Sequence, residues 1–282
     1  MIETLEINDL RYRIEFPPVD PGKPWCLFLH GFLGSAADFY HISSGITDLV
    51  NPLLIDLPGH GETETPTDPG RSDTAMLVGD LAEIIGTVAN RPVFVVGYSM
   101  GGRLALHFAS RRPEMLKALI LESTGPGLPD ENERSERRKI DQQRAEQIRK
   151  DLNRFVDEWN KMPLFRATSS LGAKRHTEHQ LSIIQRQQDP EGPAQSLQAF
   201  GAGVMPALSN TDLQKISIPV LLLAGEKDEK YVSIQQQMAG DLQNAEIKII
   251  PGAAHRVHID AAELYVAELR TFLTNRISGK SD

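Results

Sequence analysis

The chain has 282 residues, of which 40% are hydrophobic and 24% are charged, and its formal net charge at pH 7 is −8. This length and composition fit one globular domain, enlarged by an insertion, better than two independent domains. The negative charge disfavours non-specific binding to nucleic acid or to an anionic membrane surface. No apolar run approaches the length of a membrane span, and the first residues lack the basic and apolar segments of a secretory signal, so we expect a cytoplasmic protein.

Strand-like and helix-like patterns alternate over the first part of the chain. Residues 5–16 alternate polar and apolar side chains, as half-buried antiparallel strands do. Continuous apolar runs, typical of strands covered on both faces, occur at 25–29, 53–57, 93–96 and 116–121, with a helix-like stretch at 103–110. The single cysteine, Cys26, lies in the first of these runs, where we expect a buried thiol. Alternating strands and helices predict right-handed crossovers and a mostly parallel sheet.

The strand pattern is interrupted after residue 121. A charged, glutamine-rich helical tract covers residues 132–160, and further helical sequence continues to about residue 208. Strand patterns return at 218–225 and 245–250, and an amphipathic helix closes the chain at about 261–275. We therefore expect an α/β core made of residues 1–124 and 211–282, with a helical cap, or lid, formed by residues 125–210.

The segment Gly97-Tyr98-Ser99-Met100-Gly101 joins an expected strand to an expected helix. This is the context that a G-x-S-x-G nucleophile elbow requires, because the serine must stand on a sharp turn at the end of a sheet. Small residues flank the serine since bulky ones would collide with the sheet. The motif alone is common by chance, so its weight depends on the partners that Ser99 finds elsewhere.

Two candidate partners follow later strands. Asp228 comes after the strand at 218–225 and His255 after the strand at 245–250, which gives the chain order Ser, Asp, His. Each residue also has a structural explanation, as a turn serine, a helix N-cap and a loop histidine. Their joint placement at three strand ends favours a catalytic triad, in which Asp228 orients His255 and His255 takes the proton of Ser99.

Other residues near strand ends are assigned less directly. Phe32, which follows His30-Gly31, and Met100 are placed to offer backbone N–H groups to a developing oxyanion. Asp56 also ends a strand, but the following Leu57-Pro58-Gly59-His60-Gly61 is better explained as a tight structural loop. His60 and His258 remain open as pocket residues.

Arg103 lies four residues after Ser99 on the expected helix, so both side chains emerge on one face, one turn apart. A cation near the nucleophile is of little use to a neutral ester. A carboxylate-bearing substrate would gain about 1.5–3 kcal/mol from one charge-assisted hydrogen bond. The placement of Arg103 therefore favours an anionic substrate.

The chain resembles the α/β-hydrolase superfamily over nearly its whole length and, more narrowly, the 2-succinyl-6-hydroxy-2,4-cyclohexadiene-1-carboxylate synthase (MenH) family. The segments that carry the broad resemblance are 30–32, 56–61, 97–103 and 255–258, and those that carry the narrow one are Tyr98, Arg103, 122–128, 133–138, Trp159, 163–165 and Arg186. One departure is Ala254, since the family usually has glycine before the catalytic histidine. A methyl group is tolerated there if the local φ is negative.

The resemblance implies a lyase that eliminates pyruvate from a substrate with three carboxylates and needs neither a metal nor an organic cofactor. It implies that Ser99, activated by His255, removes a ring proton. Arg137 and Arg186 would join Arg103 as anchors for carboxylates, and Tyr98 and Trp159 would shape the pocket. Solvated surface arginines and a Trp159 in the lid core remain alternatives.

Two other functions remain open. A serine hydrolase of the same fold, splitting a carbon–carbon bond or a carboxylic ester, would use the same triad. A receptor-like protein that binds a small ligand and signals through its lid would need no turnover, and an intact triad disfavours it.

Overall fold

The computed structural model describes residues 1–167 and 172–279, so residues 168–171 of the expected cap lie outside the described part. Its centre is an eight-stranded sheet in the order β1-β2-β4-β3-β5-β6-β7-β8. Strands β1 and β2 and the pair β2 and β4 are antiparallel, and the remaining pairs are parallel. The strands are β1 Ile2–Ile7, β2 Leu10–Glu15, β3 Trp25–Leu29, β4 Asn51–Ile55, β5 Val93–Tyr98, β6 Leu116–Glu122, β7 Val220–Gly225 and β8 Ala245–Ile250. The predicted mostly parallel sheet is therefore confirmed.

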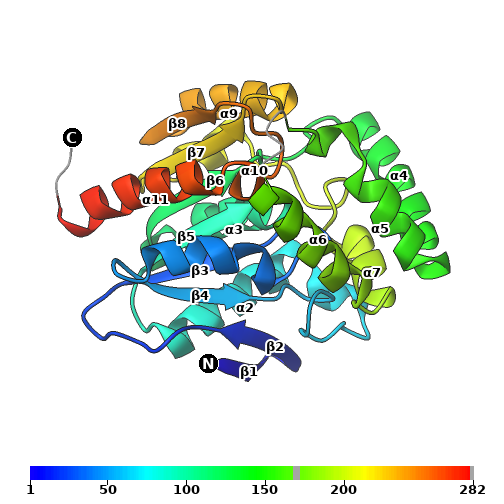
Figure 1. The fold of residues 1–282 in the computed structure, drawn as a ribbon, viewed down its shortest axis with the longest axis horizontal. Coiled ribbons are helices and arrows are strands. Elements are labelled where there is room, and N and C mark those ends of the chain that lie inside the picture. The colour runs from blue at the N-terminus through cyan, green and yellow to red at the C-terminus, as the bar shows by residue number, and fades with distance from the viewer. Residues whose placement is uncertain (168–171, 280–282) are drawn as a thin grey trace.

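Helices cover both faces of the sheet and its carboxyl edge (Figure 1). They are α1 Tyr40–Ser43, α2 Thr74–Val88, α3 Ser99–Arg111, α4 Glu131–Lys150, α5 Leu152–Asn160, α6 Gly172–Arg186, α7 Glu191–Phe200, α8 Asn210–Gln214, α9 Glu229–Asp241, α10 Val257–Asp260 and α11 Ala262–Ile277. Two apolar clusters form the core, one including side chains of α2, α3 and α9 and the other including side chains of α1 and α11. The burial of both faces explains the continuous apolar runs of β3, β5, β6 and β7.

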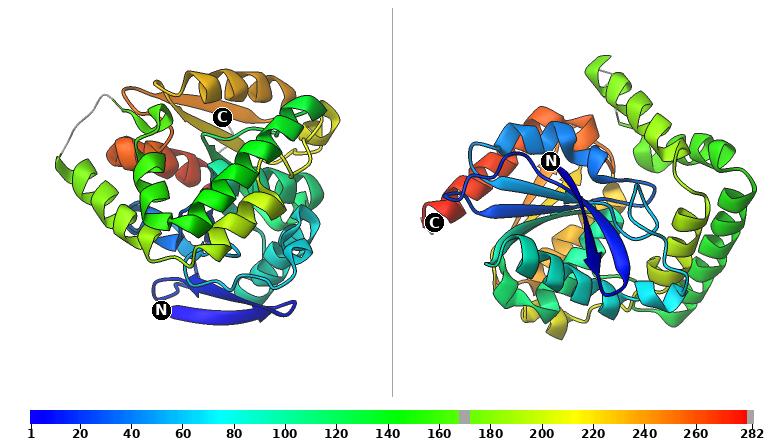
Figure 2. Two further views of the ribbon diagram at one scale, coloured as in Figure 1. Left: turned by 90° about the vertical axis from the view of Figure 1, so that its right-hand side faces the viewer. Right: turned by 90° about the horizontal axis from the view of Figure 1, so that it is seen from below.

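Helices α4–α7, between β6 and β7, stand to one side of the sheet (Figures 1 and 2). Helices α4 and α7 pack against each other, and α5 packs against α6. A smaller apolar cluster, which includes Ile148, Phe155 and Leu197, joins three of these helices to Leu33 of the core. Helices α4–α7 are called the cap below. The cap therefore faces the ends of the strands.

Two expected segments are divided in the structure. The alternating segment at 5–16 belongs to a hairpin, because Asn8 and Asp9 adopt positive φ angles of 46° and 64°, which allow a two-residue turn. The tract at 132–160 breaks at Asp151, whose carboxylate accepts the Arg154 backbone N–H at 3.0 Å and caps a new helix.

Candidate active site

Ser99 stands at the junction of β5 and α3, with a φ of 50°, in the left-handed region that side chains other than glycine rarely adopt. The neighbouring glycines explain how the turn fits. A Cβ on Gly97 would lie 2.7 Å from the Cα of Gly102, and one on Gly101 would lie 2.4 Å from the carbonyl oxygen of Leu29. The backbone is thus held in a sharp elbow that presents Ser99 beyond the sheet.

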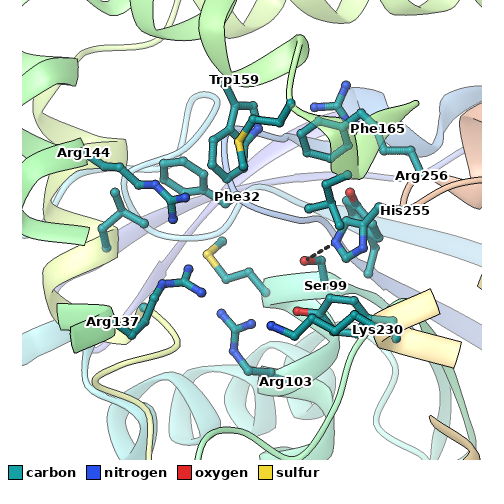
Figure 3. Close-up of a pocket in the computed structure, with 17 residues that line it drawn as sticks. Phe32, Ser99, Arg103, Arg137, Arg144, Trp159, Phe165, Lys230, His255 and Arg256 are labelled. Carbon is teal, nitrogen blue, oxygen red and sulfur yellow. Dashed lines mark hydrogen bonds between the residues drawn. The ribbon is translucent and has the colours of Figure 1, made fainter. Parts of the chain in front are cut away.

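His255 lies between Ser99 and Asp228 and bonds to both. Figure 3 shows the contact with Ser99. Its Nε2 is 3.0 Å from the Oγ of Ser99, and its Nδ1 is 2.6 Å from the Oδ2 of Asp228. Because Asp228 is an acceptor, the Nδ1–H donates to it, and Nε2 is left to accept the serine hydroxyl. His255 and Asp228 are both buried, and the ring of Tyr231 packs 4.8 Å from the His255 ring. This geometry suits proton transfer between Ser99 and His255.

The loop before His255 is held by hydrogen bonds at two consecutive residues. The Ala254 N–H donates to the Asp260 carboxylate at 2.8 Å, and the His255 N–H donates to the carbonyl oxygen of Leu164 in the cap at 3.2 Å. Ala254 is not among the residues with positive φ, so its methyl group causes no backbone strain.

Two backbone N–H groups lie beside Ser99. Phe32 and Met100 both line the cavity above the serine, and the Gly101 N–H donates to the carbonyl oxygen of His30 at 3.1 Å, which ties the Phe32 loop to α3. Met100 is the second residue of α3, where N–H groups have no partner within the helix. The Phe32 N–H has no acceptor in the part of the chain that the structure describes. Both groups are suited to a developing negative charge.

A cavity of about 210 Å³, called the inner cavity, opens above Ser99 and His255. Its basic side chains are Arg103, Arg137, Arg144, Lys230 and Arg256, and no aspartate or glutamate lines it within residues 1–167 and 172–279. A cavity with this lining favours an anionic ligand, because buried positive charge is costly unless it is paired.

Arg103 is the clearest example of a cationic side chain in this cavity without a partner in the described part of the chain. It forms no ion pair with any described residue, and its Nε is buried without a hydrogen-bond partner. Burial lowers the pKa of this guanidinium below its usual value. A carboxylate placed in the inner cavity would supply the missing acceptor.

Arg137 and Arg144 share one carboxylate. The Nε of Arg137 donates to both oxygens of Asp141, at 2.9 and 2.8 Å, and the Arg144 Nη1 donates to Asp141 at 3.2 Å. Two arginines are thus balanced by one buried carboxylate, that of Asp141, and a net positive charge remains on this wall of the inner cavity. The Arg144 guanidinium also lies over the Trp159 ring, 5.2 Å from its centroid.

Aromatic side chains form the adjoining wall. Trp159 lies edge-on to Phe32 and tilted against Phe165, with ring centroids 5.1 and 5.7 Å apart, and its Nε1 is buried without a partner. Tyr98 is buried between His255 and His258, and burial raises its pKa well above the usual value. The Trp159 N–H is therefore available to a ligand, whereas Tyr98 supports the floor of the site.

The structure places Arg186 differently from the sequence prediction. Its guanidinium donates to the Asp157 carboxylate at 2.7 Å and to the Asn153 carbonyl oxygen at 2.8 Å, and it does not line the inner cavity. The physical reason is the packing of α6 against α5, which brings acceptors on α5 within reach of the α6 terminus. In this arrangement, Arg186 ties two cap helices together.

The two histidines left open by the sequence are buried beside the site. His258 donates from Nδ1 to Glu122 at 2.7 Å, and both side chains are fully buried. His60 packs against His30, with ring centroids 5.2 Å apart. Neither lines the inner cavity. Asp56 accepts the N–H groups of Ala36 and Glu62, in agreement with its expected structural role.

Several pocket residues were missed in the sequence. Lys230 and Tyr231 lie two and three residues after the expected acid, at the start of α9, and Arg256 directly follows the expected histidine. Proximity to the triad residues was the available signal. Arg144 and Phe165 carried no such signal, since only the packing of the cap brings them to the cavity. The described residues contain no cluster of three or more potential metal ligands and no helix long and apolar enough to cross a membrane.

Comparisons with known proteins identify the family of the chain. Residues 26–268 match the model of the alpha/beta hydrolase family. A synthase of Serratia proteamaculans, named for 2-succinyl-6-hydroxy-2,4-cyclohexadiene-1-carboxylate, is 31% identical over 90% of this chain and 94% of its own. A Bacillus subtilis protein, provisionally named as the same synthase, is 38% identical over 88% of this chain and 89% of its own. The structure of MenH from S. aureus superimposes with a TM-score of 0.86 at 33% identity, covering 94% of this chain and 98% of that one. The chain therefore belongs to the 2-succinyl-6-hydroxy-2,4-cyclohexadiene-1-carboxylate synthase (MenH) family of α/β-hydrolases.

Proposed function

We propose that this protein carries out the reaction of its family through Ser99, His255 and Asp228. It is a lyase that eliminates pyruvate from 2-succinyl-5-enolpyruvyl-6-hydroxy-3-cyclohexene-1-carboxylate and leaves 2-succinyl-6-hydroxy-2,4-cyclohexadiene-1-carboxylate, a step of menaquinone biosynthesis. The observation that carries the assignment of the site is a Ser–His pair, 3.0 Å apart, beneath a cavity with five basic and no acidic lining residues in the described part of the chain.

Each proton has a place in the proposed mechanism. Ser99 gives its hydroxyl proton to the Nε2 of His255 and takes the proton from the ring carbon that bears the succinyl group. Negative charge then develops on the succinyl ketone oxygen, where the N–H groups of Phe32 and Met100 donate to it. The ring double bond shifts, the carbon–oxygen bond to the enolpyruvyl group breaks, and the enolate of pyruvate leaves. Its carbon takes up one proton, and the imidazolium of His255 gives up the proton that it received from Ser99, so the triad returns to its starting state. No water is consumed.

The buried acid makes the histidine a better base. Asp228 accepts the Nδ1–H of His255, which fixes the tautomer and stabilises the imidazolium formed when Nε2 takes the serine proton. The Tyr231 ring covers the imidazole from one side and the Phe165 ring, 6.0 Å away, from another. The histidine therefore keeps its orientation while its charge changes.

The cations of the inner cavity would bind the substrate carboxylates. Arg103 and Arg137 have free donors that face the cavity, and Trp159, whose Nε1 has no partner among the described residues, lies across the pocket near Phe165 (Figure 3). Tyr98 supports this arrangement from below. The predicted role of Arg186 requires its ion pair with Asp157 to open and α6 to move toward the cavity. A polycarboxylate substrate and a cytoplasmic location remain predictions.

A hydrolase of the same fold would use the same three side chains. The distinction is chemical, because a hydrolase adds water to an acyl group, whereas the lyase releases pyruvate and forms a conjugated diene. The cationic lining favours the lyase, since neutral esters have no use for it.

The experiment supplies freshly generated substrate and follows pyruvate release and diene absorbance together. Wild-type protein should raise both signals in equal amounts, and Ser99→Ala should lower turnover by at least about 10³, because triad members act as one unit. Hydrolysis of a simple ester without either signal would leave the triad intact and reject the lyase reaction. The matched control is Ser278→Ala, a serine of the C-terminal region remote from the cavity.

A further inference from the structure

A second cavity adjoins the inner one. This outer cavity, of about 920 Å³, lies between α4 of the cap and α9 of the core, and its wall includes Ile140, Ile234 and Asp241. Besides Arg144, which lies over the Trp159 ring, the basic side chains Arg103, Arg137 and Lys230 line both cavities. A group bound at these three side chains would therefore stand at the junction, with the reacting centre on one side and the wider space on the other.

The three cations come from three different elements, α3, α4 and α9, and point into the same part of the pocket (Figure 3). Lys230 forms no ion pair with any residue in the described ranges, and its Nζ lies 5.8 Å from the centroid of the Tyr231 ring. Arg103 is equally unpaired, and the Arg137 bonds to Asp141 use only its Nε. Most donors at the junction are therefore unoccupied.

The charges change sign along the outer cavity. Beyond the junction, its wall includes the carboxylates of Glu133, Glu136 and Asp241, whereas the inner cavity has no acidic lining residue in the described part of the chain. An anion is therefore attracted to the junction and repelled from the outer wall. The arrangement favours binding at the junction over binding elsewhere in the wider space.

We propose that Lys230 is a further substrate-binding residue, which completes with Arg103 and Arg137 a carboxylate site at the junction of the two cavities. The inference rests on the proposed function, because it assigns a partner for one of the substrate's carboxylates. A guanidinium fork and an ammonium together suit a carboxylate, since the fork binds both oxygens and the ammonium adds a movable point charge. The occupant is either the enolpyruvyl or the succinyl carboxylate, two groups with the same chemistry.

The variants Lys230→Met and Lys230→Arg test this site. Methionine keeps the length and apolar stem of lysine without its charge, and arginine keeps the charge. Lys230→Met should raise KM about tenfold and leave kcat near the wild-type value, the loss expected for one charge-assisted hydrogen bond. Lys230→Arg should restore most of the affinity. The control is Lys227→Met, which removes an exposed lysine paired with Glu226, three residues earlier in the chain.

Binding measured without turnover separates this proposal from the proposed function. Calorimetry with Ser99→Ala protein and its Lys230→Met double variant uses pyruvate and succinate as separate probes. A loss of affinity for pyruvate assigns the site to the enolpyruvyl carboxylate, and a loss for succinate assigns it to the succinyl carboxylate; either result supports the proposal. Unchanged binding of both acids and an unchanged KM would overturn it, as would equal effects of Lys227→Met. Failure of the proposed function would instead appear as absent pyruvate release by the wild type.

Discussion

The backbone N–H of His255 donates to the carbonyl oxygen of Leu164, so the loop that carries the histidine is bonded directly to the cap. The next residue adds two more contacts. The guanidinium of Arg256 stacks on Phe165, 3.8 Å from the ring centroid, and donates to the Asn160 Oδ1 at 2.8 Å. A displacement of the cap would therefore also displace the loop that carries His255.

Replacing Arg256 by methionine should loosen this link. The substitution removes the cation–π contact and the hydrogen bond to Asn160, each of which contributes about 1 kcal/mol. We expect kcat/KM to fall about tenfold and amide exchange in α5 to accelerate, measured by steady-state kinetics and hydrogen exchange. The control is Arg154→Met, which removes an exposed arginine of α5 that pairs with Glu158. Unchanged exchange in α5 would contradict the link.

Replacing Arg103 by methionine should lower the activity on an anionic substrate far more than the activity on a neutral one. Arg103 is half-buried, with a buried Nε that has no partner among the described residues, and it lies one helical turn from the nucleophile. Its loss therefore removes a charge-assisted bond of about 1.5–3 kcal/mol from a carboxylate substrate. We expect kcat/KM for the synthase reaction to fall by about 10–100-fold, and any hydrolysis of a neutral ester to change far less. Arg138→Met, whose arginine pairs with Glu131 on the surface of the cap, is the control. Equal losses for both substrates would make Arg103 a structural residue.

The buried Glu122–His258 pair should matter for stability. Glu122 ends β6 and accepts both the backbone N–H and the Nδ1–H of His258, at 3.1 and 2.7 Å. Removing one partner of a buried pair typically costs about 3–5 kcal/mol, because the other is left without compensation. Glu122→Ala should lower the free energy of unfolding in urea by about this amount. Glu158→Ala, at an exposed pair, should change it by less than about 1 kcal/mol.

Stability should fall in mild acid because of buried neutral histidines. Burial lowers the pKa of His30 and of His107 to about 4 and that of His60 to about 3. The unfolded chain, with an ordinary histidine pKa near 6.5, binds more protons than the folded protein between these values. The stabilising effect is fully present above about pH 6.5 and is lost as pH falls toward about 4.

Each of these histidines adds up to about 1.4 kcal/mol per pH unit to the slope of the unfolding free energy against pH. His107, which contacts the Pro206 carbonyl oxygen at 3.0 Å, is the best one to replace, because His30 precedes the Phe32 loop and His60 packs against Phe32. His107→Gln should reduce the slope of unfolding free energy between pH 6 and 4.5, measured by urea titration at several pH values. An unchanged slope would show that His107 does not titrate as its burial implies.

The sequence by itself determined the sheet and the elements that carry the reacting groups. Apolar runs mark strands covered on both faces, and the carboxyl ends of parallel strands meet at one edge, so residues after β5, β7 and β8 had to converge. Gly97 and Gly101 could be interpreted for the same reason, because the elbow that they permit is a local backbone property. Arg103 could be placed because helical geometry fixes its direction relative to Ser99.

Tertiary structure alone decided which cap side chains face the cavity. The part of the tract that forms α4 is charged around most of its circumference, so its pattern does not show which face turns inward. Arg144 lies in the cavity and Arg186 does not, because the packing of α4 against α7 and of α5 against α6 sets the direction of each face. Likewise, Glu122 and His258 are 136 positions apart, and only the folded chain brings them together. A local sequence pattern cannot indicate contacts between residues so far apart in the chain.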